Sequence, residues 1–255
     1  MAPRLALLKC ATPIPSVQRE NGDYLQMFRE LLRNALPRPD LDFQLDGFDV
    51  VHNMEYPLAD TMDVYSGVLI SGSAASAYDD KEWINKLVGW VKWLAEAKPN
   101  IKIFGICFGH QIVARALGGT CEPNGQWEVG PTVVSLTDAG KAVFGKDSLY
   151  LQQMHRDHVP DVVPGFELLG STPICRNHGM VKYADADPHS IHILTMQGHP
   201  EFTAQIVDKI IDARVQGGIL DARTAQDYAT RRAWTNDGVT VVGRTIWKSL
   251  GVEAA

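Results

Sequence analysis

The stretch from Ile101 to Gly119 constrains the fold most, because it combines an apolar run, a glycine-flanked cysteine and a helical pattern. Ile101, Ile103, Phe104 and Ile106 form a short apolar run, which is typical of a strand buried on both faces of a parallel sheet. Apolar residues then recur at helical spacing until two glycines end the pattern. The stretch therefore predicts a buried strand that turns sharply into a helix, as in α/β proteins.

Cys107 lies at the centre of this stretch, between Gly105 and Gly109, in the pattern G-x-C-x-G. Glycines allow the tight turn that projects a nucleophile above a sheet. A thiol at the start of a helix is favoured in its reactive thiolate form by the positive end of the helix dipole. An isolated cysteine is more often an ordinary buried core residue. Here the flanking glycines and the strand-to-helix context favour a nucleophile.

His199 and Glu201 belong to the sequence Gly-His-Pro-Glu, which follows a second apolar run. In an extended segment, residues two apart point to the same side, so Glu201 can orient the imidazole of His199. A cysteine, a histidine and a carboxylate in this arrangement predict a nucleophilic triad of Cys107, His199 and Glu201. The alternative is a surface turn in which Glu201 only favours the start of the next helix.

The motifs GICFGHQ around Cys107 and QGHPE around His199 together resemble the class I glutamine amidotransferase domain. This resemblance implies a flavodoxin-like fold, with Cys107 as the nucleophile, His199 as the base and Glu201 as its orienting partner. The Ser-Gly-Ser turn after the third expected strand resembles the family segment that completes the oxyanion hole. The backbone N–H groups of Ser73 and Phe108 are then the expected oxyanion donors, although a Ser-Ala pair replaces the usual Gly-Pro.

The same resemblance assigns five further residues to the substrate, namely Gly72, Gln111, His155, Arg156 and Asp157. Gly72 lies in the oxyanion turn, and Gln111 matches a family position that helps to fix the substrate. The Met-His-Arg-Asp segment resembles the family's Ser-His-x-Asp region, which lies near the amino-acid end of bound glutamine. For Gln111, the alternative is a residue on the surface of a helix.

The resemblance implies that a thiolate attacks a γ-glutamyl carbonyl and that water releases glutamate from a thioester, with no cofactor. The motifs look most similar to the γ-glutamyl-peptidase-like branch, and the chain offers no space for a synthetase domain. We therefore expect a standalone hydrolase or peptidase that acts on a small-molecule γ-glutamyl substrate. The alternative is a glutaminase subunit that passes ammonia to a separate synthetase. A non-catalytic binding or regulatory subunit is disfavoured, because all three triad positions are filled.

A formal net charge of −6 argues against nucleic acid or an anionic membrane as a partner. No stretch approaches the roughly 18 apolar residues that span a bilayer, and the apolar run at the start is too short for a signal peptide. We therefore expect a cytoplasmic protein with four reduced cysteines. The cysteine spacing and the pairs His155/His158 and His189/His192 lack the frame of a zinc site, so we expect no metal.

Apolar patterns along the rest of the chain predict alternating strands and helices, followed by several short strands. Besides the stretch around Cys107, we expect strands at 4–9, 42–51, 64–70, 129–136, 148–153, 166–171, 180–183 and 192–196, a loop at 10–16, and helices at 23–34, 79–98, 202–215, 221–232 and 239–250. This order predicts a mostly parallel central sheet flanked by helices, with a smaller β-rich insertion. We expect an amidotransferase-like domain at 1–217 and a C-terminal helical extension at 218–255.

Overall fold

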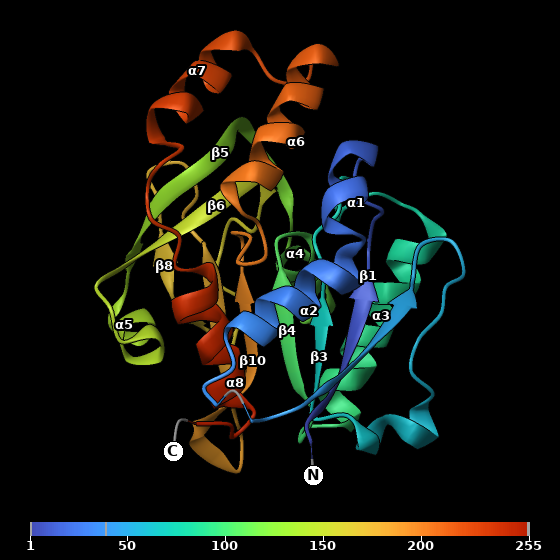
Figure 1. Cartoon of the computed structure of the whole chain (residues 1–255). Helices are drawn as coiled ribbons and strands as arrows, with labels where there is room; N and C mark the ends of the chain where they lie inside the picture. Colours follow the sequence, from blue (N-terminus) through green and yellow to red (C-terminus); the bar gives the residue numbers. More distant parts are fainter. Residues whose placement is uncertain (1, 39, 254–255) are drawn as a thin grey trace.

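The computed structural model describes residues 2–38 and 40–253, which form helical layers on both sides of a central sheet (Figure 1). The seven strands of this sheet follow the order β2-β1-β3-β4-β10-β9-β7. The strands are β1 (Arg4–Lys9), β2 (Gln44–Asp49), β3 (Gly67–Ile70), β4 (Lys102–Ile106), β7 (Glu167–Leu168), β9 (Gly179–Ala184) and β10 (Asp187–Met196). The first five strands in the spatial order are parallel, whereas β9 and β7 run antiparallel to their neighbours. The predicted mostly parallel sheet is therefore confirmed.

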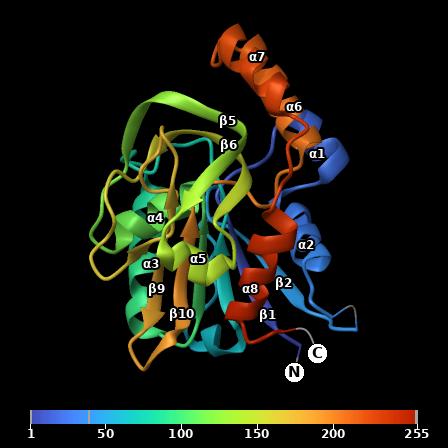
Figure 2. The ribbon, with the colours of Figure 1, turned by 90° about the vertical axis from the view of Figure 1, so that its left-hand side faces the viewer.

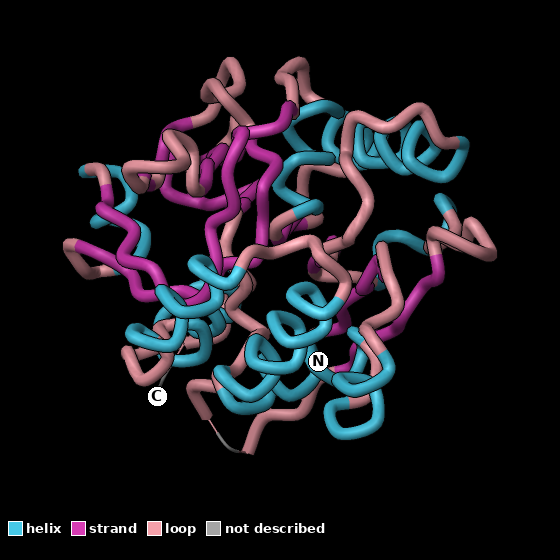
Figure 3. Tube along the Cα trace, turned by 90° about the horizontal axis from the view of Figure 1, so that it is seen from above, coloured by secondary structure: helices cyan, strands magenta, loops and turns pink. Residues whose placement is uncertain are grey.

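Each face of the sheet has its own apolar core, because side chains alternate between the two faces of a strand. In β1, Leu5 and Leu7 belong to one core, and Ala6 and Leu8 belong to the other. The first core is covered by α2 (Tyr24–Asn34), α6 (Ala204–Gln216) and α8 (Arg244–Ser249), and the second by α3 (Glu82–Ala97) and α4 (Phe108–Ala116). Figures 2 and 3 show helices on both sides of the strands.

The helices form where the sequence supplies an apolar stripe and a cap. The side chain of Asp23 accepts a hydrogen bond from the backbone N–H of Gln26, and the side chain of Gln26 accepts one from the backbone N–H of Asp23, which fixes the start of α2. In α3, Ile84 and Leu87 are fully buried, so the expected stripe faces the core. None of the described helices is long and apolar enough to cross a membrane.

A second, three-stranded antiparallel sheet confirms the expected β-rich insertion. It has the order β6-β5-β8 and consists of β5 (Glu122–Leu136), β6 (Ser148–His158) and β8 (Gly170–Ser171). The single strand expected at 166–171 is instead two strands, because the chain passes from one sheet to the other at Leu169. The N–H of Leu169 donates to the carbonyl of Gly179, and its own carbonyl accepts from the N–H of Thr137.

The segment after α6 contains α7 (Ala222–Arg231), a π-helical turn η2 (Gly238–Gly243) and α8. It returns to the first core, where Trp247 is fully buried and donates its indole N–H to the carbonyl of Leu32 at 2.8 Å. The helix expected at 239–250 therefore begins as a π-helix. The division between 1–217 and 218–255 stays a prediction, and residues 1, 39, 254 and 255 of these ranges lie outside the described residues.

Three short elements were not expected from the sequence: α1 (Pro15–Asn21), the 3₁₀ helix η1 (Ala59–Val64) and α5 (Asp138–Phe144). The prediction of a loop up to residue 16 is wrong at its end, because Pro15 takes the first helical position of α1. Proline is favoured there, since its fixed φ suits a helix and its missing N–H leaves no bond unmade.

Candidate active site

Cys107 stands directly after β4 and before the first residue of α4. The end of β4 that leads into α4 lies on the side of the molecule opposite the two chain termini (Figure 1). Its φ of 52° lies in the left-handed region, which a residue with a side chain occupies only under constraint. A Cβ at Gly105 would lie 2.7 Å from the carbonyl oxygen of Gly109, and one at Gly109 would lie 2.3 Å from that of Ile70. Both glycines are therefore required for the tight turn that the motif predicts.

His199 lies three residues beyond the end of β10, the parallel neighbour of β4, and this pairing brings the two segments together. The N–H of Cys107 donates to the carbonyl of Met196 at 2.8 Å. A Cβ placed on Gly72 would lie 2.7 Å from Cε1 of His199 and 3.7 Å from Cβ of Cys107. The imidazole of His199 and the Cβ of Cys107 therefore both lie close to Gly72.

The imidazole of His199 is fixed on two sides. Its Nδ1 lies 2.8 Å from Oε1 of Glu201, and its ring stacks on that of Phe202, with ring centroids 4.0 Å apart and planes 2° apart. His199 and Glu201 are both buried, so the alternative of an exposed surface turn is wrong. The structure places Cys107, His199 and Glu201 in one site, and their catalytic roles stay a prediction.

Burial alone would lower the pKa of His199, because a charged imidazole loses its hydration. The negative charges of Cys107 and Glu201 outweigh burial and raise this pKa to about 10. A protonated imidazole is therefore the favoured state of His199 near neutral pH. Such an imidazolium can donate a proton to a leaving amine.

The expected oxyanion donors lie on two elements that meet at Cys107. Phe108 is the first residue of α4, where the N–H groups of a helix lack partners within the helix. Ser73 lines the cavity above Cys107 and accepts a hydrogen bond from the N–H of Ala75 through its side chain. The hydroxyl of Ser71 accepts from the N–H of Cys10 at 2.9 Å, which anchors this turn to the end of β1.

Gln111 is almost fully buried, so the alternative of a surface helix residue is wrong. Its side-chain amide donates to the carbonyl of Asp157 and to Oε1 of Gln197, both at 3.1 Å. Gln197 in turn places its amide 3.5 Å from the sulfur of Cys107. The sequence analysis did not single out Gln197, although it lies in the QGHPE motif. The carboxylate of Asp157 accepts a hydrogen bond from Ser76 at 2.6 Å.

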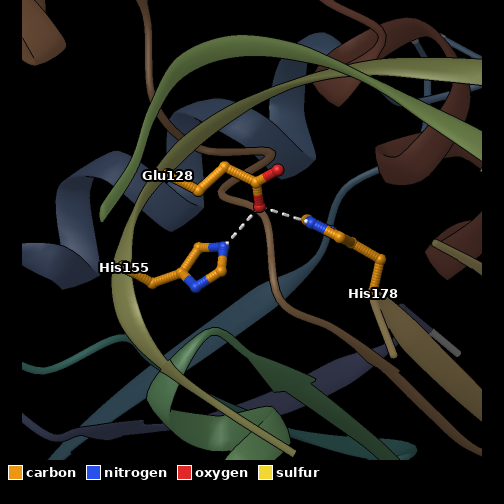
Figure 4. A group of neighbouring side chains, drawn as sticks. All are labelled: Glu128, His155 and His178. Carbon is orange, nitrogen blue, oxygen red and sulfur yellow. Dashed lines mark hydrogen bonds and ion pairs between the residues drawn. The ribbon is translucent and has the colours of Figure 1, made fainter. Parts of the chain in front are cut away.

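His155 belongs to a buried cluster with Glu128 and His178, shown in Figure 4. One oxygen of Glu128 lies 2.8 Å from Nε2 of His155 and 2.7 Å from Nε2 of His178, and the other accepts from Thr172 at 2.7 Å. Burial opposes the charge of Glu128, but the two histidines outweigh it and keep the pKa of this carboxyl below its usual value. Nδ1 of His155 faces the carbonyl of Asp157 at 3.1 Å, so the cluster supports the chain beside Gln111.

Among the described residues, Glu128, His155 and His178 also form the one group with ligand atoms close enough to hold a metal ion. Zinc ligands lie about 2.0–2.2 Å from the ion and therefore more than about 3 Å from one another. The oxygen-to-nitrogen distances of 2.7 and 2.8 Å are hydrogen-bond lengths instead. The donor set fits a carboxylate that accepts three hydrogen bonds better than it fits a metal site.

A cavity of about 460 Å³ opens above Cys107. It reaches from Cys107, His199 and Gln111 to a second region formed by Trp127 on β5, Arg156 on β6 and Arg214 on α6. Its remaining lining residues come from the segment before α1, from α1 and α2, from the turn after β3, from β6, and from α6 and the segments on either side of it: Ala11, Thr12, Pro13, Ile14, Val17, Tyr24, Met27, Ser73, Ala74, Ala75, Ser76, Met154, His155, Asp157, Phe202, Ile210, Ala213 and Ile219.

The sequence and the fold both have known relatives. Residues 23–212 match the family model described as glutamine amidotransferase class-I. A glutamine amidotransferase-like protein of Schizosaccharomyces pombe is 38% identical over 211 residues, which cover 81% of this chain and 82% of that protein. Gamma-glutamyl peptidase 4 of Arabidopsis thaliana is 32% identical over 231 residues, which cover 86% of this chain and 84% of that protein. The crystal structure of a glutamine amidotransferase from Thermotoga maritima has a TM-score of 0.69 at 18% identity, covering 98% and 99% of the two chains.

Proposed function

Since the chain belongs to the class I glutamine amidotransferase family, we propose that it hydrolyses a γ-glutamyl amide bond with Cys107 as the nucleophile. His199 is the proposed general base and acid, and Glu201 orients it. The observation that carries this proposal is the geometry around Cys107: a strained residue at the start of α4, with a buried His199 and Glu201 pair across Gly72.

In the first half-reaction, the Cys107 thiolate attacks the γ-carbonyl carbon and forms a tetrahedral intermediate. The backbone N–H groups of Ser73 and Phe108 hold its oxyanion. The imidazolium of His199 then donates its proton to the departing nitrogen as the C–N bond breaks. The amine leaves, and a γ-glutamyl thioester on Cys107 remains. Glu201 holds Nδ1 of His199 throughout, so that Nε2 can face the reacting groups.

In the second half-reaction, His199 removes a proton from water, which attacks the thioester carbonyl. The C–S bond breaks, glutamate leaves, and the thiolate and imidazolium are restored. The atoms of the substrate and one water molecule account for both products, so the reaction needs no oxidant, reductant or cofactor.

A standalone γ-glutamyl peptidase is the preferred form of this activity. Relatives named gamma-glutamyl peptidase 4 and 5 are 32% and 30% identical to the chain. The cavity extends well past Cys107, so it has room for a leaving group larger than ammonia. All four cysteines are free, which suits work in the reducing cytoplasm. The alternative is a glutaminase subunit, which would pass ammonia to a separate synthetase.

The test is glutamate release by the purified chain alone from a γ-glutamyl dipeptide and from free glutamine. We expect a higher kcat/KM for the dipeptide and loss of both activities in Cys107→Ser. Cys121→Ser is the matched control, because Cys121 is buried and lies outside the cavity lining, and it should keep the activity. Hydrolysis of glutamine alone, and only after a partner protein is added, would support the glutaminase subunit.

A further inference from the structure

Two arginines share one tryptophan in the outer part of the cavity. The guanidinium carbon of Arg214 lies 4.5 Å from the ring centroid of Trp127, and that of Arg156 lies 5.6 Å from the same centroid. All three side chains line the cavity that contains Cys107 and His199. Because they come from β5, β6 and α6, their meeting is a product of the fold rather than of a local motif.

Neither guanidinium forms an ion pair with any residue in the described parts of the chain. Four other arginines do: Arg4, Arg33, Arg231 and Arg232 each lie within 3.2 Å of an aspartate oxygen. Burial lowers the pKa of Arg214, and the like charge of Arg156 lowers it further, while the negative charge of Cys107 raises it. Two guanidinium groups thus lie in the cavity of the nucleophile with no carboxylate partner among the described residues.

The family resemblance places the Met-His-Arg-Asp segment, Arg156 included, near the amino-acid end of the substrate, whereas the side chain of Arg156 lies over Trp127 beside that of Arg214. That end is assigned to Asp157 and Gln111, which are linked by a hydrogen bond. Successive side chains of a strand point to opposite faces, so the side chain of Arg156 leaves β6 on the side opposite to those of His155 and Asp157, although all three residues line the cavity. Arg156 instead lies near α6. Ile210 on α6 and Ile219, just after the end of this helix, add apolar surface to the cavity.

We propose that Trp127, Arg156 and Arg214 form a leaving-group subsite that binds the carboxylate of a γ-glutamyl amino acid or short peptide. This inference rests on the proposed hydrolysis of a γ-glutamyl amide. The guanidinium groups supply charge-assisted hydrogen bonds to the carboxylate, and Trp127 holds the two groups in place by cation–π contact. Ile210 and Ile219 contact the apolar part of the departing residue. The preferred substrate class is therefore one whose leaving group is an amino acid rather than ammonia or a neutral amine.

The test compares γ-glutamylglycine with γ-glutamylglycinamide, which differ only in the charge at the end of the leaving group. We expect wild-type kcat/KM to be at least about tenfold higher for the acid, as a hydrogen bond to a charged group predicts. In Arg214→Gln this ratio should fall to about one, and Arg156→Gln, whose side chain is more exposed, should lower it by a smaller factor. A ratio measured within one variant cancels any change in the folded fraction.

Arg223→Gln is the matched control, because Arg223 is exposed on α7 and does not line the cavity. It should keep the wild-type ratio. Equal kcat/KM for the two substrates in the wild type would overturn the subsite while leaving the proposed hydrolysis intact. A ratio that stays high in Arg214→Gln, or an equal loss for both substrates, would also overturn it. If the wild type releases glutamate from neither compound, the proposed function fails and the subsite fails with it.

Discussion

Replacement of Gly72 by alanine tests the geometry of the site with a single methyl group. The added Cβ would lie 2.7 Å from Cε1 of His199, and ordinary contact begins at 3.4 Å. The ring would therefore have to move by about 0.7 Å, or the turn that carries Gly72 would have to retreat. The backbone conformation of Gly72 itself does not oppose alanine, because its φ is not in the left-handed region.

The imidazole has little freedom to move away. Phe202 stacks on one face at 4.0 Å, and Glu201 holds Nδ1 at 2.8 Å. A misplacement approaching 1 Å at reacting groups costs on the order of a hundredfold in rate. We therefore expect Gly72→Ala to lower kcat/KM for a γ-glutamyl dipeptide by about a hundredfold. Overpacking of this kind should lower the free energy of unfolding by about 1–3 kcal/mol.

The measurements are kcat/KM, the rate of Cys107 alkylation by iodoacetamide, and the free energy of unfolding from urea titration. Alkylation should slow, since the displaced imidazolium stabilises the thiolate less. Gly89→Ala is the matched control: the same methyl group meets no atom within 4 Å on the exposed side of α3. It should keep the activity and raise stability by up to about 1 kcal/mol. Wild-type activity in Gly72→Ala would refute the placement of His199 against this turn.

Three further predictions concern buried charged groups. The pKa of His199 is raised from 6.5 to about 10, so its charge stabilises the fold fully below pH 6.5, and this contribution is lost as pH rises toward 10. Urea titrations should show a smaller loss of stability over this range in His199→Gln than in the wild type, and identical pH slopes would contradict the shift. Glu128→Gln should lower the free energy of unfolding by about 3 kcal/mol, because it removes the charge that both buried imidazoles face. EDTA should leave the melting temperature of the wild type unchanged, whereas a large decrease would indicate a metal at Glu128.

The fold could be predicted where the signal is local. The strand, elbow and helix around Cys107 follow from consecutive residues, and so does the contact between His199 and Glu201, which are two positions apart. The split of the strand at 166–171 could not be predicted, because its cause is a hydrogen bond from Leu169 to the carbonyl of Gly179 in another strand. The π-helical start at 238–243 likewise carries no distinct sequence period.

The parts of the site that the sequence did not reveal are those assembled from distant strands. Glu128 and His178 are 50 positions apart, and no spacing rule joins them to His155. Their union follows from the pairing of β5 with β6, which puts Glu128 opposite His155 in register. The same pairing places Trp127 and Arg156 near Arg214 on α6. This antiparallel strand pair thus presents a buried carboxylate that supports the chain near the nucleophile and, one residue earlier, an aromatic ring that contacts two cations. Since adjacent residues of a strand face opposite sides, the pair can serve the scaffold and the cavity at once.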